Sequence, residues 1–188
     1  MYTERGAPVK ERLLAATITC LRRKGFEATT ARDIAAEAHA NLRSIGYHYG
    51  STRALLLAAI SANWRSWLAP LISAAADTEL EPSERLRVGM ELFVTELQEN
   101  AAIVRAWLEA VAIAHRDDQL RQVLSANQLE FSAALAQTLA QAGENDPHVR
   151  AAAIISVCDG AIVRYLLHGC TPAPREIAEA AAAGLANC

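Results

Sequence analysis

Apolar residues recur every three or four positions in the first part of the chain. This spacing places them on one face of a helix. The positions are Val9, Leu13, Ala16 and Cys20. Three basic residues, 22–24, come next, and positive charges are favourable at the carboxyl end of a helix, where the helix dipole is negative. Gly25 comes directly after them. The pattern predicts a helix over 9–24 that ends in a left-handed cap at Gly25.

Two short helices are predicted next. Thr30 and Asp33 have the spacing of a capping box, in which each side chain bonds the backbone N–H of the other residue. They predict a helix over 30–38. Asn41 is a good cap for a second short helix over 42–47. Only about three residues separate the two helices.

The rest of the chain shows longer helical segments. Ser51 is expected to cap a helix that begins at Thr52, and Pro70 is expected to kink or end it. The acidic stretch 77–82 is predicted to be a loop. Further helices are predicted over 82–99, 101–115, 117–142, 147–168 and 173–187. We therefore expect an all-α protein with about nine helices in total.

Composition agrees with a helical fold. Hydrophobic residues make up 52% of the 188 residues, alanine and leucine dominate, and glycine and proline are sparse. No apolar run approaches the roughly 20 residues that span a bilayer, and the first residues lack the apolar core of a secretion signal. We expect a cytoplasmic protein with no membrane association.

Charge is unevenly distributed along the chain. Residues 1–65 hold ten Lys and Arg against five Asp and Glu, whereas the remaining residues hold eight against 16. A basic first part favours a polyanion such as DNA as its partner. The same bias also fits a solvated surface without a partner.

Metal or catalytic chemistry has little support in the sequence. The four cysteines, Cys20, Cys158, Cys170 and Cys188, form no C-x-x-C pair and no zinc-type cluster with histidine. We expect reduced thiols, with a redox role for the last three as the alternative. A helical-bundle enzyme would need facing Glu-x-x-His pairs or a nucleophile with a base, and we find neither. We therefore predict no enzyme activity, no metal and no cofactor.

The two short helices and their tight turn form a helix-turn-helix pattern. Such pairs are common in all-α proteins, so the helix pair alone does not identify a DNA-binding motif, and the individual residues must be compared. The informative ones are Leu13 to Ala16, Leu21, Lys24 to Thr30, Arg32 to Ala35, Ala38, Ile45, Tyr47 to Tyr49, Ser51, Leu55 and Leu56. In this order and spacing, over roughly Val9 to Leu68, the chain resembles the TetR family of transcription regulators. The later segments Trp107 to Glu109 and Asp159-Gly160 are similar to the family's regulatory domain, with weaker specificity.

The resemblance implies two domains. The first, 1–50, is a three-helix DNA-binding domain with its core over 9–50 and its motif at about 30–49. A helix over 51–69 links it to the second, 51–188, which is a larger helical domain for ligand binding and dimerisation.

Five positions depart from the family's pattern. His39-Ala40 stands where the turn usually has Gly-Val, and Arg43 where glycine is often found. Gly46 replaces a usual tyrosine, and Thr52 replaces a frequent lysine. Glycine at position 46 weakens a helix by about 0.5–1 kcal/mol relative to alanine. The departures concern the turn and the operator contacts.

DNA contacts follow from the resemblance and from groove geometry. The third helix should present Leu42, Arg43 and Ser44 to base edges in the major groove, with Asn41 at its start. Arg43 is the best base reader because its guanidinium matches guanine. The contacts expected along the phosphate backbone are Thr30, Arg32, Tyr47, His48 and Thr52. The alternatives are a solvated Arg43, a packing role for His48 and a purely capping Thr30; Tyr49 is expected to be a core residue.

The second domain is expected to hold the dimer interface and a ligand. Small and apolar residues of the last two helices predict a four-helix dimer interface, with an interior helix pair as the alternative. The predicted interface residues are Ala152, Ile155, Ser156, Ala161, Ile162, Ile177 and Ala181. The candidate ligand residues are Trp64, Trp67, Met90, Phe93, Trp107, Phe131 and Asp159, each of which also fits an ordinary core. Further candidate polar anchors are Glu109, His115, Arg164 and His168.

Together these features predict a sequence-specific DNA-binding transcription regulator. We expect a homodimeric repressor that leaves a pseudo-palindromic operator when a small-molecule effector of unknown identity binds. The alternative is a helical interaction or ligand-binding protein that has lost operator binding.

Overall fold

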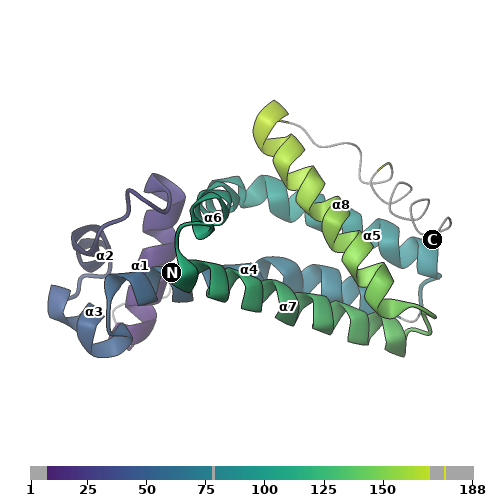
Figure 1. Ribbon diagram of the computed structural model, residues 1–188, viewed down its shortest axis with the longest axis horizontal. Coiled ribbons are helices and arrows are strands. Elements are labelled where there is room, and N and C mark those ends of the chain that lie inside the picture. The colour runs from purple at the N-terminus through teal and green to yellow at the C-terminus, as the bar shows by residue number, and fades with distance from the viewer. Residues whose placement is uncertain (1–7, 78, 170–175, 177–188) are drawn as a thin grey trace, which may run out of the picture. The chain divides into compact units, whose positions relative to one another are not determined.

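A computed structural model of the chain describes residues 8–77, 79–169 and 176. These residues contain eight α-helices and no strand (Figure 1). The helices are α1 (Val9–Lys24), α2 (Ala31–Glu37), α3 (Leu42–Tyr49), α4 (Thr52–Ala76), α5 (Pro82–Glu99), α6 (Ala101–Ala114), α7 (Asp118–Gln141) and α8 (Pro147–His168). The predicted all-α fold is confirmed. The ninth predicted helix, 173–187, lies outside the described residues, apart from position 176.

The chain divides into two compact units. The first is Met1–Trp64 together with Ala102–Ser125, and the second is Arg65–Ala101 together with Ala126–Cys188. The division therefore falls inside α4. The predicted domains divide the chain elsewhere, after residue 50, and remain a prediction.

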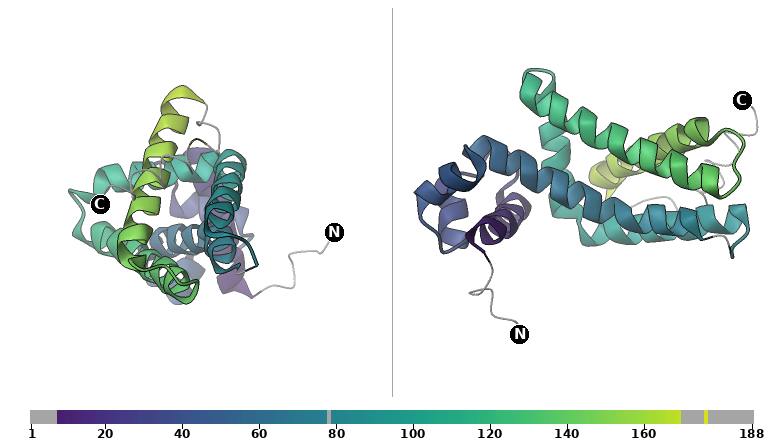
Figure 2. Two further views of the ribbon diagram at one scale, coloured as in Figure 1. Left: turned by 90° about the vertical axis from the view of Figure 1, so that its right-hand side faces the viewer. Right: turned by 90° about the horizontal axis from the view of Figure 1, so that it is seen from below.

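The first unit is built around α1, α2 and α3, which pack against one another (Figure 2). Its core contains large side chains with almost no exposed surface, among them Leu13, Leu21, Phe26, Ile34 and Leu55. Residues of α6 and the start of α7 complete the same core: Ile103, Ala106, Ala110 and Leu120. The apolar stripe seen in the sequence of α1 thus becomes the buried side of that helix.

Local caps fix the ends of α2, α3 and α4 as predicted. Thr30 and Asp33 form both bonds of the capping box, and the Asn41 side chain accepts from the N–H of Arg43 at 2.9 Å. The Ser51 hydroxyl accepts from the N–H of Ala54 at 3.0 Å. Because each cap uses only neighbouring residues, the sequence was sufficient to locate it.

The turn between α2 and α3 has an unusual residue. The N–H of Ala40 donates to the Ala35 carbonyl, and the N–H of His39 donates to the Ala36 carbonyl. This pair of bonds is the Schellman arrangement, which usually has glycine in the left-handed position. His39 occupies that position with a φ of 47°, and it is the one residue other than glycine with positive φ in the described part of the chain.

Two predictions about helix ends were wrong in detail, and of the two outcomes expected at Pro70, a kink or a helix end, the helix end is contradicted. Gly25 has the expected positive φ of 84°, but its ψ of −179° makes it extended rather than left-handed helical. The third helix continues to Tyr49 instead of ending at 47, because Gly50 with positive φ is its cap. The fourth helix does not end at Pro70 but continues to Ala76. A proline removes one hydrogen bond, and the carbonyl it leaves belongs to Ser66, which is exposed to water.

The second unit combines the end of α4 with α5, most of α7, and α8. Its core contains Met90, Phe93, Leu97, Leu135 and Ile162. Among the described residues, α4 and α8 are also long and apolar enough to cross a membrane by length and composition alone. This is weak evidence, because the core helix of a soluble protein passes the same test.

Candidate nucleic-acid interface and apolar pocket

The outer face of α3 is rich in exposed side chains. Tyr47 is 87% exposed and Leu42 is 48% exposed, and Arg43 is exposed beside them. Only Ile45 of this helix is buried. Large apolar and aromatic groups held at the surface by one buried anchor are available to a partner.

The other predicted DNA contacts lie near α3 or at the start of α2. Arg32 and Asn41 are exposed, whereas Ser44 and Thr52 are half-buried. The half-buried ring of His48 lies edge-on to Tyr47, with ring centroids 4.9 Å apart.

Thr30 is exposed, but its hydroxyl is already engaged. It donates to Oδ2 of Asp33 at 2.7 Å and accepts from the N–H of Asp33 at 3.3 Å. Lys24 donates to Oδ1 of the same carboxylate at 2.6 Å. The bonds from Lys24 and Thr30 hold the pKa of Asp33 well below its usual value of 3.8. The amino end of α2 is therefore stabilised by a carboxylate that is charged at neutral pH.

Tyr49 connects α3 to α1. Its hydroxyl donates to the carbonyl of Lys10 at 2.8 Å, and the Lys10 ammonium lies 5.9 Å from the centre of its ring. Its ring packs against the core of the first unit, and burial raises the pKa of the phenol. Tyr49 thus fixes the end of α3 by packing and by one hydrogen bond.

Glu109 of α6 bonds to the turn after α1. Its Oε2 accepts from the N–H of Phe26 at 2.8 Å, so it anchors this turn instead of lining the pocket described below. Nearby, Arg53 forms an ion pair with Asp117, and its guanidinium lies 5.0 Å from the ring centre of Phe26. These contacts join α4, α6 and the α1–α2 turn within the first unit.

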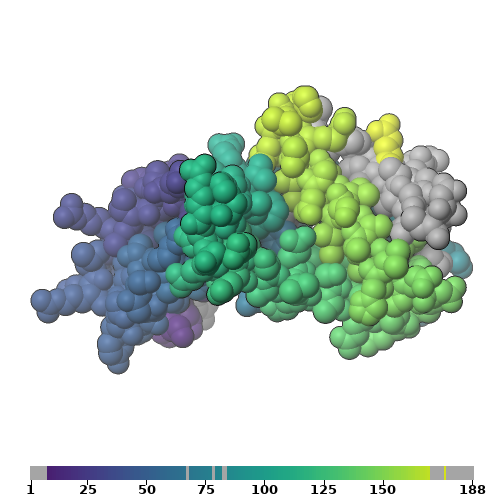
Figure 3. Space-filling view, in the orientation of Figure 1, coloured from purple at the N-terminus to yellow at the C-terminus, as the bar shows by residue number. Residues whose placement is uncertain are grey.

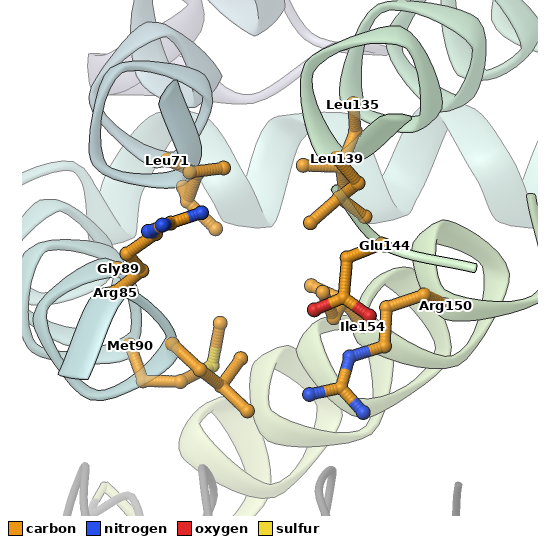
Figure 4. Close-up of a pocket in the computed structure, with 11 residues that line it drawn as sticks. Leu71, Arg85, Gly89, Met90, Leu135, Leu139, Glu144, Arg150 and Ile154 are labelled. Carbon is orange, nitrogen blue, oxygen red and sulfur yellow. The ribbon is translucent and has the colours of Figure 1, made fainter. Parts of the chain in front are cut away.

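An apolar pocket lies within the second unit (Figure 4). Its empty space, counting the part open to solvent, is about 480 Å³. Its aliphatic walls come from four helices: Leu71, Ala75, Leu86, Met90, Leu135, Leu139 and Ile154. Three charged residues, Arg85, Glu144 and Arg150, also line it.

Of the predicted ligand residues, Met90 lines this pocket. Trp64 and Trp107 instead stack on each other in the first unit, with centroids 4.9 Å apart and planes 17° apart. Phe93 and Phe131 are buried in the second unit, and Asp159 is half-buried on α8, where burial raises the pKa of its carboxyl. The side chain of Trp67 lies outside the described part of the structure.

One side of α8 is exposed along its length, as the space-filling view shows (Figure 3). The exposed residues on this face are Val149, Ala152, Ser156, Gly160, Val163 and Leu167. They are apolar or small and recur every three or four positions. The predicted interface residues Ala152 and Ser156 belong to this face.

The other predicted interface residues lie elsewhere. Ile155, Ala161 and Ile162 are buried inside the second unit, because they are on the opposite side of the helix. Ile177 and Ala181 lie outside the described residues.

Cysteine and metal chemistry can be assessed for the described residues. Cys20 and Cys158 are buried free thiols, and burial raises the pKa of both. A raised pKa leaves little reactive thiolate at neutral pH. Cys170 and Cys188 lie outside the described part. Within it, no group of three or more His, Cys, Asp or Glu side chains could hold a metal ion.

Comparison with known families gives two matches that together cover most of the chain. Residues 13–59 match the family model described as "Bacterial regulatory proteins, tetR family". Residues 82–188 match the model described as "BetI-type transcriptional repressor, C-terminal". The chain belongs to the TetR family of transcription regulators. The resemblance found in the sequence is confirmed.

Individual relatives agree with this assignment. The HTH-type transcriptional dual regulator CecR of Shigella flexneri is 32% identical over 138 residues, which are 70% of this chain and 56% of that protein. The match thus spans little more than half of this curated relative. A solved structure from Pseudomonas aeruginosa PAO1 is 25% identical with a TM-score of 0.75, covering 95% of this chain and 88% of the other. The multidrug binding protein EbrR, solved with imidazole, is 25% identical with a TM-score of 0.69, covering 93% and 95%.

The charged residues of the pocket were missed in the sequence. Arg85, Glu144 and Arg150 come from α5, from the turn before α8, and from α8 itself. No spacing rule links residues on three elements. Their convergence depends on helix packing, which a single TetR-family sequence does not reveal.

Proposed function

We propose that this TetR-family chain is a cytoplasmic homodimer that binds a pseudo-palindromic DNA operator and releases it when a small molecule occupies the second unit. The observation that carries the proposal is the exposed face of α3, where Arg43 is exposed and Tyr47 is 87% exposed. An arginine at the start of a short exposed helix suits base recognition in the major groove.

Recognition is divided between base edges and phosphates. Leu42, Arg43 and Ser44 contact bases, because the amino-terminal turn of a recognition helix enters the groove first. Phosphate contacts come from Thr30, Arg32, Tyr47, His48 and Thr52, with Asn41 holding the start of α3. The Thr30 hydroxyl must exchange its bond to the Asp33 carboxylate for one to a phosphate, whereas Arg32 is exposed and ready.

Dimerisation uses the exposed face of α8. A two-fold interface brings the same face of both copies together. The small residues Ala152, Ser156 and Gly160 allow two such helices to approach closely, and Val163 and Leu167 supply apolar surface to bury.

The effector binds in the pocket of the second unit. Its aliphatic walls and three charged residues suit a small molecule of mixed polarity. The relative EbrR has been solved with imidazole bound, which supports a small-molecule site in this fold. Linkage requires that the effector lower the affinity for the operator by the same factor by which the operator lowers the affinity for the effector. The corresponding coupling free energy is typically about 1–3 kcal/mol.

A salt titration on operator DNA selected from random duplexes tests the proposal. Wild-type protein should show a steep fall of log affinity with log salt and a sequence-selective component near physiological salt. Arg43→Ala should relax sequence selectivity, whereas Tyr47→Phe should weaken all duplexes alike. Arg65→Gln is the matched control, because it removes one positive charge from an exposed residue of the second unit. Equal, negligible effects of Arg43→Ala and Tyr47→Phe would refute this docking, and indifference to every duplex would favour a protein without operator binding.

A further inference from the structure

The charged residues of the pocket in the second unit are not balanced. Arg85 and Arg150 supply two positive charges, and Glu144 supplies one negative charge. The remaining lining side chains are aliphatic, apart from the sulfur of Met90 and from Gly89. A ligand in this pocket therefore meets one net positive charge and an apolar surface.

The two arginines differ in what they already bind. Nε of Arg85 donates to the Leu80 carbonyl at 2.8 Å, and its Nη1 donates to the Ala142 carbonyl at 3.5 Å. These bonds connect the start of α5 to the end of α7. Arg85 is therefore partly committed to holding the two walls together.

Arg150 is the residue with donors to offer. It is half-buried, and its side chain makes no hydrogen bond or ion pair within residues 8–77 and 79–169. Glu144 lies on the same side of the pocket with its carboxylate directed inward, yet it too is unpaired within those ranges (Figure 4). A half-buried guanidinium has five N–H donors and is stabilised by a carboxylate or a similar planar anion.

We propose that this pocket binds an amphipathic monoanion, whose apolar body lies among Leu71, Met90 and Leu135 and whose anionic head binds Arg150. The proposal rests on the effector role proposed above for the pocket. Glu144 limits the charge that the site accepts, because a second negative charge on the ligand would face its carboxylate. The ligand class is therefore a carboxylate, or a comparable single anion, with an aliphatic or flat apolar tail.

Calorimetric titration of the full chain without DNA tests the ligand class. The probes are octanoate, 1-octanol and octylammonium, which share one tail and differ in head charge. Octanoate should bind about tenfold or more tightly than the other two, since a hydrogen bond to a charged group is stronger than one between neutral groups. Octyl phosphate, whose head group carries nearly two negative charges at pH 8, should bind more weakly than octanoate. Tighter binding of octylammonium, or no binding of any probe, would overturn the proposal.

Variants locate the interaction. Arg150→Gln should weaken octanoate binding about tenfold and leave 1-octanol binding unchanged, which also shows that the pocket remains folded. Glu144→Gln should strengthen octanoate binding and lessen the discrimination against octyl phosphate. Arg121→Gln removes a positive charge from the first unit and should change neither octanoate binding nor 1-octanol binding. An octanoate affinity that Arg150→Gln does not lower would overturn the assignment of the head group.

A separate DNA-binding assay distinguishes this proposal from the regulator role. If octanoate binds but leaves operator affinity unchanged, the ligand class is supported and the effector role is overturned. If the chain binds its operator selectively but no octanoate, the ligand class fails and the regulator role stands.

Discussion

The Oε2 atom of Glu109 accepts a hydrogen bond of 2.8 Å from the backbone N–H of Phe26, although the two residues are 83 positions apart in the sequence. Gly25 makes this approach possible. A Cβ at position 25 would lie 2.5 Å from the same carboxylate oxygen. A carboxylate of α6 thus packs closely against the turn between α1 and α2.

Replacing Glu109 should destabilise the first unit. Glu109→Ala leaves the partly buried N–H of Phe26 without its acceptor, and this should lower the free energy of unfolding by about 1–3 kcal/mol. Glu109→Gln keeps an oxygen acceptor at the same position and should cost less. Urea unfolding of both variants measures the difference. Equal losses would show that the hydrogen bond does not stabilise this turn.

Two glycines should respond to alanine in opposite directions. Gly25→Ala combines positive φ with the close contact to Glu109, so we expect a loss of stability of more than about 1 kcal/mol. Gly46→Ala lies inside α3 with nothing within 4 Å of its added Cβ, and it should stabilise by about 0.5–1 kcal/mol. Thermal or urea unfolding checks both. A loss of stability in Gly46→Ala would contradict the helical environment described for this position.

In the turn between α2 and α3, glycine at position 39 should give a more stable protein than the native histidine. His39 has a φ of 47°, which costs an ordinary L-residue about 1–2 kcal/mol. His39→Gly relieves this strain but increases the freedom of the unfolded chain, so the net gain should be roughly 0.5–1 kcal/mol. His39→Ala keeps the strained φ and should give no gain. The urea midpoints of the two variants compare them directly.

Acid should remove the stability that Asp33 contributes. Because Lys24 and Thr30 hold the pKa of Asp33 below 3.8, its charged form stabilises the fold above that pH. This contribution is lost as the pH falls from about 3.8 toward the lower pKa of the folded state. The stability difference between wild type and Asp33→Asn should therefore shrink over that interval in urea unfolding from pH 7 to 2. Lys24→Gln removes the hydrogen bond from Lys24 to Asp33, so its stability difference from wild type should also shrink over that interval, but by less. A stability difference that does not change with pH would contradict the role of the charged Asp33.

Dimerisation should depend on the α8 face and not on α7. Leu167 of α8 and Leu129 of α7 are 72% and 71% exposed, so they form a matched pair. Leu167→Glu places a charge at the proposed two-fold contact of both copies and should weaken the dimer about a hundredfold or more. Leu129→Glu should leave it intact. Sedimentation or light scattering over a concentration series measures both, and the reverse result would move the interface to α7.

The elements that the sequence located depend on neighbouring residues. The capping box of Thr30 and Asp33, the cap at Asn41 and the apolar stripe of α1 each involve residues within a few turns of one helix. Such features can be recognised from the spacing of neighbouring residues alone. The DNA-contact candidates on α3 were proposed from the family resemblance and from the geometry of the major groove.

The pocket could not be found in this way. Aromatic residues were chosen as candidate ligand contacts because they are large and adaptable, yet the rings of Trp64 and Trp107 stack on each other. Glu109 was a candidate anchor and instead binds the Phe26 N–H. Each of these side chains contacts a residue of another element, far away in the sequence.

The sequence by itself determined that this protein is all-α and where its first helices begin, because caps and helical periodicity are local properties. Its likeness to the TetR regulators came from the match of individual residues in order and spacing. Tertiary structure alone decided which charged side chains share a pocket, which side of α8 stays exposed, and that Pro70 does not end α4. The physical reason is that these outcomes depend on how helices pack, and packing energy is a property of pairs of surfaces rather than of one segment.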